Sequence, residues 1–432
     1  MIRAKALIQR GMNSRFLRGV AVLTSANAAG QLILLAVVPL LTRLYTPSDF
    51  GVFAVFGAVM SVVLVASSLR YELAIPLPRH ERDAETLLII ALMINVTTAL
   101  IMVVVVFLLG ERIATWTETP ALASVLWLLP IVILVAGTYK ALKFWAVRRR
   151  DFRRIAKTRI SQSLANATAQ VLGGLAGLGV WGLVIGHAIG QSAGVRSLSS
   201  NLGLVTWTKD AISRPLRSKA LIRRHRRFPM YDVPAAVVNT ASVQLPNFLL
   251  AVLFSPVVAG FYYLADRILA TPMTMVSQAV AQVLYGDMRN LLAAGKARQR
   301  CFQLLLVMAI IGLPPTLVIF FYAEPIFAAV FGEDWRDAGV YASWLIAGLF
   351  VQFLYSPLSM VLMAIEGQIF NFLVHLLIGA MKVGALGAAY VIEDEMVAVM
   401  GIAGATMVGY GVAVGLVFFL LSRSGRVVSN AW

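Results

Sequence analysis

Two cationic residues lie deep inside apolar stretches of the sequence, where charges are uncommon. Arg267 lies roughly ten residues into one stretch, a depth of about 15 Å at the rise of an α-helix, and Lys382 lies similarly far from the end of another. A charge at the centre of a bilayer is costly, so such residues usually face a watery cavity or a counterion. The arginine fork suits phosphate oxygens, and a lysine acts as a point charge. We expect both to line a cavity that receives an anionic group; the alternative is a structural Arg267, paired with a helix carbonyl or an acid.

A third cation, Arg70, follows the second expected membrane span and begins the segment Arg70-Tyr-Glu-Leu-Ala-Ile-Pro-Leu-Pro78. Either this segment is a solvated loop with an interfacial tyrosine, or Arg70 attracts an anionic headgroup at the cytoplasmic mouth of a path. Asp266 adjoins Arg267, but neighbouring helical residues do not face each other, so the two need not pair. As candidates for coupling to a proton or a sodium ion we single out the acids Asp266, Glu72 and Glu366.

Uncharged polar residues also lie within the apolar stretches. Each can bond to a neighbouring helix, which is the commoner role of such residues in membranes. Their concentration in the first, seventh and eighth expected spans is also what a hydrophilic path through the protein would need. As candidates for lining that path we single out Asn27, Gln31, Asn247 and Gln278.

The composition excludes an ordinary soluble protein. The chain of 432 residues is 59% hydrophobic and only 13% charged, which predicts an all-α protein that crosses a membrane many times. The single cysteine, Cys301, excludes an internal disulfide and a cysteine-rich metal site. The sequence has no P-loop, and we expect no metal or other cofactor. A net charge of +17 would suggest nucleic acid in a soluble protein, but here the basic residues lie between apolar spans, so we expect no nucleic-acid partner.

One segment matches a nucleophile motif and is better explained by helix packing. Gly190-Gln-Ser-Ala-Gly194 fits the G-x-S-x-G pattern, with His187 one turn away, but it lies within an apolar helix and lacks the strand-to-helix turn that the motif requires. Glycines recur there at every fourth position, at 182, 186, 190 and 194. Such a stripe lets a second helix approach closely. We therefore expect a packing surface and no enzyme.

Apolar stretches of about 20 residues predict twelve transmembrane helices. In the first half these are Gly19–Leu44, Phe50–Leu69, Thr86–Leu109, Val125–Phe144, Ile160–Leu178 and Trp181–Leu198. In the second half they are Val233–Phe254, Val257–Leu284, Cys301–Phe321, Ala338–Met363, Gln368–Val391 and Val397–Leu421.

The basic residues predict how these spans are oriented. Most of the 37 lysines and arginines lie in the two tails, in the central linker and in loops on one side. Cytoplasmic loops retain positive charge, so both termini are expected in the cytoplasm, which requires an even number of spans. The basic N-terminus leads into a segment too long for a signal peptide, and we expect the first span to stay in the membrane.

A sequence repeat indicates that the chain consists of two similar halves. Leu44-Tyr-Thr-Pro-Ser-Asp-Phe-Gly-Val-Phe53 and Leu253-Phe-Ser-Pro-Val-Val-Ala-Gly-Phe-Tyr262 share a leucine, a proline, a glycine and two aromatic positions at the same spacing. The offset is close to half the chain, as a duplicated helix bundle would give. We expect a six-helix bundle over residues 1–205, a basic cytoplasmic linker over 206–228 and a second bundle over 229–432, around a central cavity.

Several of these segments together resemble a known family. They are Leu44 to Phe53, Arg70 to Pro78, Arg227-Phe-Pro-Met-Tyr-Asp-Val-Pro-Ala235, Gln244-Leu-Pro246, Ala259-Gly-Phe-Tyr-Tyr-Leu-Ala-Asp-Arg267 and Ser277-Gln-Ala-Val-Ala-Gln-Val-Leu-Tyr285. This set is similar to the bacterial polysaccharide transporters (Wzx-type oligosaccharide flippases) of the multidrug, oligosaccharidyl-lipid and polysaccharide exporter superfamily. The resemblance covers essentially the whole chain and does not specify the glycan.

The resemblance implies a fold and an activity. It implies two six-helix bundles around a cavity that opens alternately to either side, and transfer of an undecaprenyl-diphosphate-linked oligosaccharide to the periplasmic leaflet of the bacterial inner membrane. The expected partners are that lipid-linked substrate, membrane lipids, and polysaccharide polymerase and chain-length machinery, and a monomer is the expected state. Two other functions stay open: a cation-coupled multidrug exporter on the same fold, and a membrane glycosyltransferase or ligase acting on the same carrier lipid.

Overall fold

The computed structural model describes residues 14–116, 120–200, 202–364 and 368–427, which form helices joined by short turns. Within these ranges no residue is in a β-strand. The chain divides into two compact units, and each is described by itself. Unit 1 comprises Met1–Tyr45 and Val59–Val237, and unit 2 comprises Thr46–Ala58 and Val238–Trp432.

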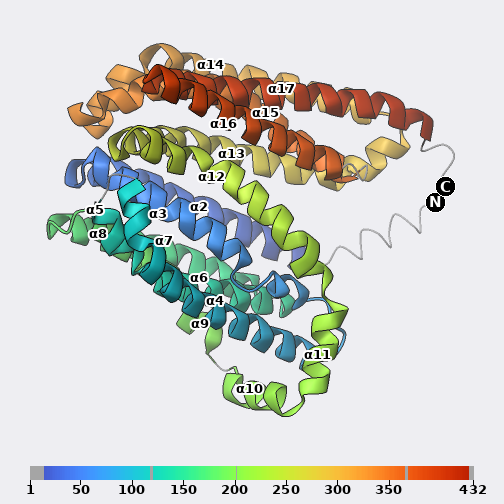
Figure 1. The fold of residues 1–432 in the computed structure, drawn as a ribbon. Helices are drawn as coiled ribbons and strands as arrows, with labels where there is room; N and C mark the ends of the chain where they lie inside the picture. Colours follow the sequence, from blue (N-terminus) through green and yellow to red (C-terminus); the bar gives the residue numbers. More distant parts are fainter. Residues whose placement is uncertain (1–13, 117–119, 201, 365–367, 428–432) are drawn as a thin grey trace. The chain divides into compact units, whose positions relative to one another are not determined.

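Unit 1 is built from long helices and a basic linker (Figure 1). Its elements are α2 (Ser14–Leu44), the C-terminal end of α3 (Pro47–Ala66), the 3-10 turn η1 (Tyr71–Ala74), α4 (Glu81–Trp116), α5 (Pro120–Leu126), α6 (Leu129–Arg148), α7 (Phe152–Leu175), α8 (Val180–Ser192), α9 (Val195–Ser199), α10 (Leu204–Ser213), α11 (Pro215–Arg224) and the π-helical turn η2 (Phe228–Asp232). The expected linker thus forms two short helices, α10 and α11.

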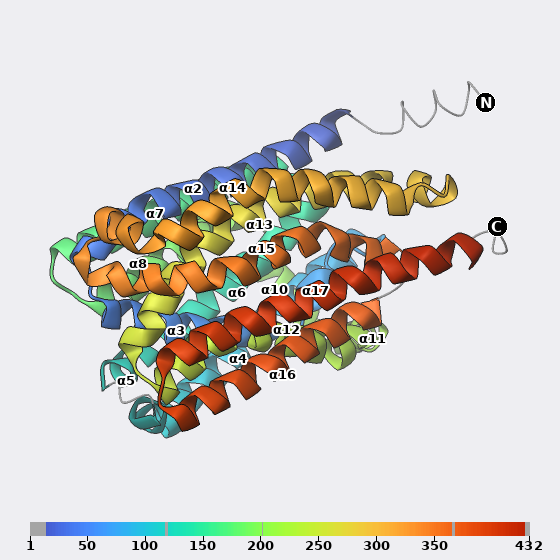
Figure 2. The same ribbon diagram turned by 90° about the horizontal axis from the view of Figure 1, so that it is seen from above.

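Unit 2 contains the N-terminal turns of α3 and the second half of the chain. Its elements are α12 (Val233–Leu253), α13 (Pro256–Ala293), α14 (Ala297–Phe331), the 3-10 turn η3 (Glu333–Trp335), α15 (Arg336–Ala364), α16 (Gln368–Ile392) and α17 (Glu395–Val427). Helices α16 and α17 lie side by side in both views (Figures 1 and 2).

Local chemistry explains where several helices begin and end. Asp49 accepts hydrogen bonds from the backbone N–H and the hydroxyl of Thr46, at 3.0 and 2.9 Å, and so caps the start of α3. Asp151 caps α7 by accepting the N–H of Arg154. Gly332, with a φ of 109°, ends α14, because that backbone conformation disfavours a side chain. The sequence therefore encodes these boundaries locally.

Each of the twelve predicted spans overlaps a helix, but Trp181–Leu198 is divided between α8 and α9, and Val125–Phe144 begins in α5 and continues in α6. Among the described residues, nine helices are long and apolar enough to cross a membrane: α2, α3, α4, α6, α12, α14, α15, α16 and α17. Helices α7, α8 and α13 do not meet that measure. Helix α7 carries several buried polar residues, α8 is short, and α13 contains Asp266 and Arg267.

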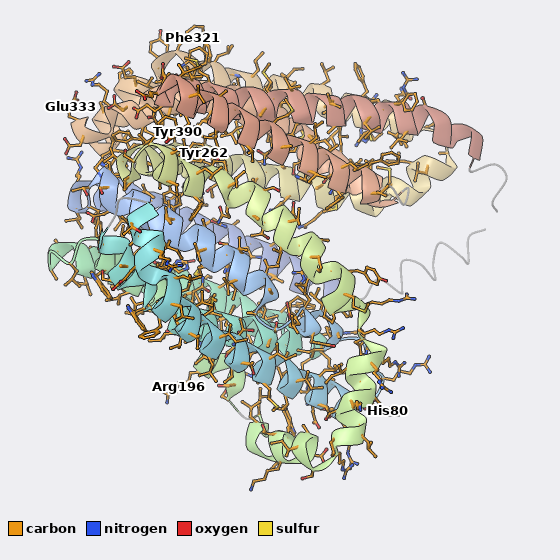
Figure 3. The ribbon with its side chains drawn as sticks, in the orientation of Figure 1. His80, Arg196, Tyr262, Phe321, Glu333 and Tyr390 are labelled. Carbon is orange, nitrogen blue, oxygen red and sulfur yellow. The ribbon has the colours of Figure 1, made fainter. Side chains whose placement is uncertain are left out.

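Large apolar side chains cover the outside of these helices. Phe107, Ile311 and Phe321 are 72%, 65% and 68% exposed, and Figure 3 shows Phe321 projecting outward from α14. A soluble monomer rarely exposes so much apolar surface. These side chains are placed as lipid-facing residues would be.

The glycine stripe of α8 packs as predicted. A Cβ added at Gly186 would lie 2.5 Å from Gln170, and one at Gly190 would lie 2.6 Å from Asn166. A Cβ at Gly182 would lie 3.0 Å from Gly173 and 2.3 Å from the Tyr45 hydroxyl. The missing side chains therefore let α8 lie directly against α7. The corresponding glycines of α17, at 411 and 415, face open space, so that pair does not repeat the packing role.

The two copies of the repeated sequence contact each other reciprocally within unit 2. A Cβ at Gly51 would lie 1.7 Å from the carbonyl oxygen of Pro256, and one at Gly260 would lie 1.9 Å from that of Pro47. Pro47 and Gly51 are the repeat equivalents of Pro256 and Gly260. The glycine of each copy therefore packs against the proline backbone of the other copy, as in a self-complementary contact.

Candidate functional site

Arg267 lies in α13, beside a tyrosine from the preceding turn. Its Nη1 donates a hydrogen bond to the Tyr263 hydroxyl at 2.7 Å, and its guanidinium lies 5.7 Å from the centre of the same ring. The spacing of four residues places the two side chains on one helix face. Arg267 forms no ion pair with any acid in the described part of the chain, and Asp266 does not pair with it. Its positive charge is therefore not neutralised by a carboxylate there.

Tyr263 also joins Arg267 to the repeat contact. Its ring lies 5.9 Å from that of Phe53 and 6.3 Å from that of Phe50, centre to centre. Phe50 in turn packs edge-on against Trp335 at 4.9 Å. These spacings are typical of favourable aromatic pairs. Through Tyr263, Arg267 thus contacts an aromatic cluster within unit 2.

Lys382 lies within electrostatic range of Asp266, which belongs to another helix. The two charges interact electrostatically between α16 and α13. Lys382 also acts on His375, and Asp266 acts on Tyr410 of α17. The sequence could not reveal this grouping, because the residues come from three separate helices. Lys382 therefore interacts electrostatically with an acid, Asp266, whereas Arg267 forms no ion pair with an acid of the described residues.

Glu72 is fully buried and paired. One carboxylate oxygen accepts the Ser68 hydroxyl, and the other lies 2.7 Å from Lys140 Nζ. Lys140 also donates to the carbonyls of Leu64 and Val65 at 3.1 and 3.4 Å. Those carbonyls belong to the last turn of α3, where helical acceptors lack partners. Lys140 therefore ties Glu72 to the end of α3, a structural role that stands beside any part in ion coupling.

Arg70 is joined to the start of the second half of the chain. Its Nε donates to Asp232 of η2 at 2.7 Å, and the neighbouring Tyr71 hydroxyl donates to the carbonyl of Ile222 at 3.3 Å. Both Leu69 and Arg70 have left-handed backbones, with φ of 47° and 62°, a conformation uncommon outside glycine. Two of the segments that carry the family resemblance, those beginning at Arg70 and Arg227, thus contact each other in unit 1.

The polar candidates are spread over both units. Asn27 and Gln278 are exposed, and Gln31 is half-buried in α2. Asn247 is 7% exposed and donates to the Gln244 side chain at 3.3 Å, while its own oxygen accepts no hydrogen bond from the described part of the chain. Glu366 lies outside the described residues. Gln31 lines a cavity that the structure defines.

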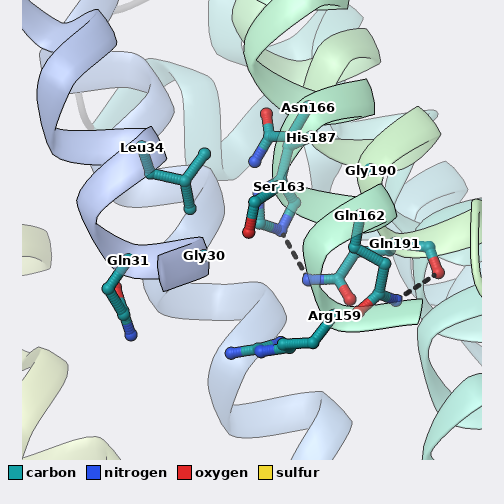
Figure 4. A pocket seen from close by; sticks show the side chains of 10 residues that line it. All are labelled: Gly30, Gln31, Leu34, Arg159, Gln162, Ser163, Asn166, His187, Gly190 and Gln191. Atoms are coloured by element: carbon teal, nitrogen blue, oxygen red, sulfur yellow. Dashed lines mark hydrogen bonds between the residues drawn. The ribbon is translucent and has the colours of Figure 1, made fainter. Parts of the chain in front are cut away.

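That cavity lies in unit 1, between α2, α7 and α8, and has a volume of about 170 Å³. Figure 4 shows Arg159 extending from α7 toward α2, where Gln31 lies. Polar side chains supply most of the remaining wall: Gln162, Ser163, Asn166, His187 and Gln191. Counting loop charges assigned Arg159 to a cytoplasmic loop, but α7 already begins at Phe152. The missed indication was the polar spacing Arg159, Gln162, Ser163 and Asn166, which is that of one helix face.

Comparison with known proteins places these features in a family. The model of a family described as "Polysaccharide biosynthesis protein" matches residues 40–340. The chain is 27% identical over 314 residues to the succinoglycan biosynthesis transport protein ExoT of Rhizobium meliloti (strain 1021), which covers 72% of this chain and 60% of that protein. It is 24% identical over 309 residues to the lipopolysaccharide biosynthesis protein WzxC of Escherichia coli (strain K12), covering 68% and 61%. The chain thus spans about three fifths of the length of these relatives.

Solved structures share the fold at low sequence identity. An inward-facing multidrug resistance MATE family transporter of the MOP superfamily aligns with a TM-score of 0.73 and 13% identity, over 93% of this chain and 99% of that one. The lipid II flippase MurJ in an inward closed conformation aligns with a TM-score of 0.69 and 13% identity, over 94% and 91%. At this identity the likeness concerns the fold alone.

The matched region includes the cavity-lining residues of α7 and α8 as well as Arg70 and Arg267. Nine membrane-compatible helices and a family match over more than half of the sequence make this a multi-pass membrane protein. The family expected from the sequence segments is confirmed: the chain belongs to the family described as "Polysaccharide biosynthesis protein".

Proposed function

We propose that the protein is a flippase, a transporter and not an enzyme, which moves a lipid-linked oligosaccharide across the bacterial inner membrane for polysaccharide biosynthesis. The carrier is an undecaprenyl diphosphate, and access alternates between the two sides of the membrane. The observation that carries this proposal is Arg267, a cation inside a long helix whose hydrogen-bond partner is the neutral Tyr263. An arginine so placed can bind a phosphate group through two parallel hydrogen bonds.

The helices that are too short or too polar to be counted among the nine apolar ones, α7, α8 and α13, support this assignment. We propose twelve crossings in two bundles of six, with both termini in the cytoplasm, the crossings beyond the nine apolar ones being α7, α8 with α9, and α13. These three carry the polar cavity of unit 1 and Arg267 of unit 2. Polar residues inside membrane helices usually mark a substrate path. The reduced hydropathy of these helices is what a path for a charged, hydroxyl-rich substrate requires.

The remaining candidate residues keep roles within this proposal. Lys382 and Arg70 are proposed as further cations for the anionic group, and Asn27, Gln31, Asn247 and Gln278 as contacts for sugars. Asp266, Glu72 and Glu366 are proposed as sites for a coupling ion. Of these acids, Asp266 is favoured, because its interactions with Lys382 and Tyr410 link three helices.

Deleting the gene tests the proposal. Lipid-linked oligosaccharide should accumulate on the cytoplasmic leaflet, and a plasmid copy should restore polysaccharide export. An Arg267→Ala copy should reach the membrane at normal abundance but fail to restore export. A deletion strain with unchanged export and new sensitivity to cationic drugs would instead favour a multidrug exporter, and glycosyl transfer by the purified protein would favour an enzyme on the same lipid.

A further inference from the structure

Two buried side-chain oxygens in the wall of the unit 1 cavity could each accept a hydrogen bond. Gln162 is 5% exposed and Asn166 is 9% exposed, and neither side-chain oxygen has a hydrogen-bond partner among the described residues. The Gln162 amide nitrogen is already committed, because it donates to the carbonyl of Gln191 at 3.1 Å, which fixes the oxygen on the other side. Leaving a buried acceptor without a hydrogen bond costs about 1–3 kcal/mol of stability. These two oxygens therefore favour an occupant of the cavity that donates hydrogen bonds.

The cation Arg159 also lines this cavity. Arg159 is half-buried and forms no ion pair with any acid in the described ranges. Arg159 acts electrostatically on another cation, Lys143 of α6. The described residues that line the cavity include no carboxylate. The site therefore favours an anion and disfavours a sodium ion or another bare cation.

Close helix packing creates and limits this space. Gly190 allows α8 to approach Asn166, since a Cβ there would lie 2.6 Å from the Asn166 Cβ, and Gly30 does the same for α2, 2.7 Å from Ser163 Oγ. The resulting volume of about 170 Å³ can be compared with cavities of about 150 Å³ that admit one six-membered ring. Here the walls are polar and not apolar (Figure 4).

From these observations we infer that the α2–α7–α8 cavity is a binding site for one anionic sugar unit, with Arg159 holding its carboxylate or phosphate and Gln162 and Asn166 accepting its hydroxyls. A bare anion would leave both amide oxygens unsatisfied, and a neutral sugar would leave Arg159 without a counterion. A group that combines hydroxyls with an anion satisfies both. This inference rests on the proposed function and names the class of sugar that the site selects.

Binding to the purified full-length protein in lipid nanodiscs tests the inference. The probes are glucuronate, glucose 1-phosphate, glucose and inorganic phosphate, each measured by calorimetry or ligand-detected NMR. One or both anionic sugars should bind about ten-fold or more tightly than glucose and than inorganic phosphate, since a charge-assisted hydrogen bond adds to the hydroxyl contacts. Which of the two binds tells whether the anion is a carboxylate or a phosphate.

Variants assign the binding to this cavity. Arg159→Gln should remove the preference for the anionic sugar, Arg159→Lys should weaken it, and Asn166→Leu should weaken all sugars together. The matched control is Arg153→Gln, an exposed cation on the same helix, which should bind like the wild type. Thermal unfolding of each variant establishes that it is folded.

Three outcomes would overturn the inference: no sugar binding, equal binding of inorganic phosphate and glucose 1-phosphate, or stabilisation by sodium that Asn166→Leu abolishes. None of these depends on transport. Loss of sugar binding with normal flipping would remove only this site, whereas binding by a protein whose deletion leaves lipid-linked oligosaccharide undisturbed would contradict only the proposed function.

Discussion

The reciprocal glycine contact of the repeat predicts a difference between two alanine substitutions on one helix. At Gly51 a Cβ would lie 1.7 Å from the Pro256 carbonyl oxygen, and ordinary contact begins at 3.4 Å, so the two backbones must move apart by about the same distance again. At Gly57, two turns further along α3, a Cβ meets nothing within 4 Å. Gly57→Ala is therefore a matched control.

The magnitude follows from these two environments. Alanine favours a helix over glycine by about 1 kcal/mol, a gain that both variants share. Overpacking costs about 1–3 kcal/mol, and only Gly51→Ala incurs it. We expect Gly51→Ala to be less stable than Gly57→Ala by about 1–3 kcal/mol, measured as a lower Tm by intrinsic fluorescence of the purified protein.

A double variant sharpens the test. Separation of the backbones by Gly51→Ala also makes room at Gly260, whose Cβ would lie 1.9 Å from the Pro47 oxygen. The second substitution should therefore cost less in the presence of the first, as coupled neighbouring sites do. Equal Tm values for Gly51→Ala and Gly57→Ala, or strict additivity of Gly51→Ala and Gly260→Ala, would refute the reciprocal contact.

Three further predictions concern the site and its supports. Tyr263→Phe keeps the ring over Arg267 but removes the 2.7 Å hydrogen bond, and should lower export about ten-fold, since a bond to a charged group contributes about 1.5–3 kcal/mol; export equal to that of the exposed control Tyr322→Phe would contradict this. Arg70→Asp and Asp232→Arg should each reduce the free energy of unfolding by about 1 kcal/mol. Because the two side chains form a 2.7 Å ion pair, the double variant with exchanged charges should recover the wild-type Tm. A Tm of the double variant no higher than that of either single variant would contradict this ion pair. Burial, followed by the charge of Arg224, lowers the pKa of His225. The folded protein therefore favours neutral His225, and the packing of α11 should weaken as pH falls below about 6.5. Hydrogen exchange of residues 215–224, corrected for intrinsic rate, should rise at low pH in the wild type and not in His225→Gln, and a pH-independent rate would contradict this prediction.

Hydropathy and local sequence predicted the helices well. Every predicted span overlaps a helix, because length and apolar content are properties of a single segment. The glycine stripe of α8 was also readable, since one helix face suffices to define it. The position of Arg267 inside a long helix needed only its distance from the preceding turn at Pro256.

Contacts between distant segments could not be predicted in this way. The approach of Asp266 to Lys382, and the pairing of Arg70 with Asp232, depend on how separate helices pack. Arg159 was hidden for a different reason: charges near a span end look like loop charges until the helix boundary is known. The family segments nevertheless held a clue, because the conspicuous sequences at Arg70 and Arg227 are also contact partners.

Reconstituted transport tests the central claim most directly. Purified protein is placed in proteoliposomes containing an undecaprenyl-diphosphate-linked oligosaccharide, and the fraction of glycan accessible to an external, membrane-impermeant glycan-binding protein is followed with time. We expect wild-type protein to render the internal pool accessible, and Arg267→Ala, folded to the same Tm, not to do so. Equal rates for wild type and Arg267→Ala, or no rate above that of protein-free liposomes, would contradict it.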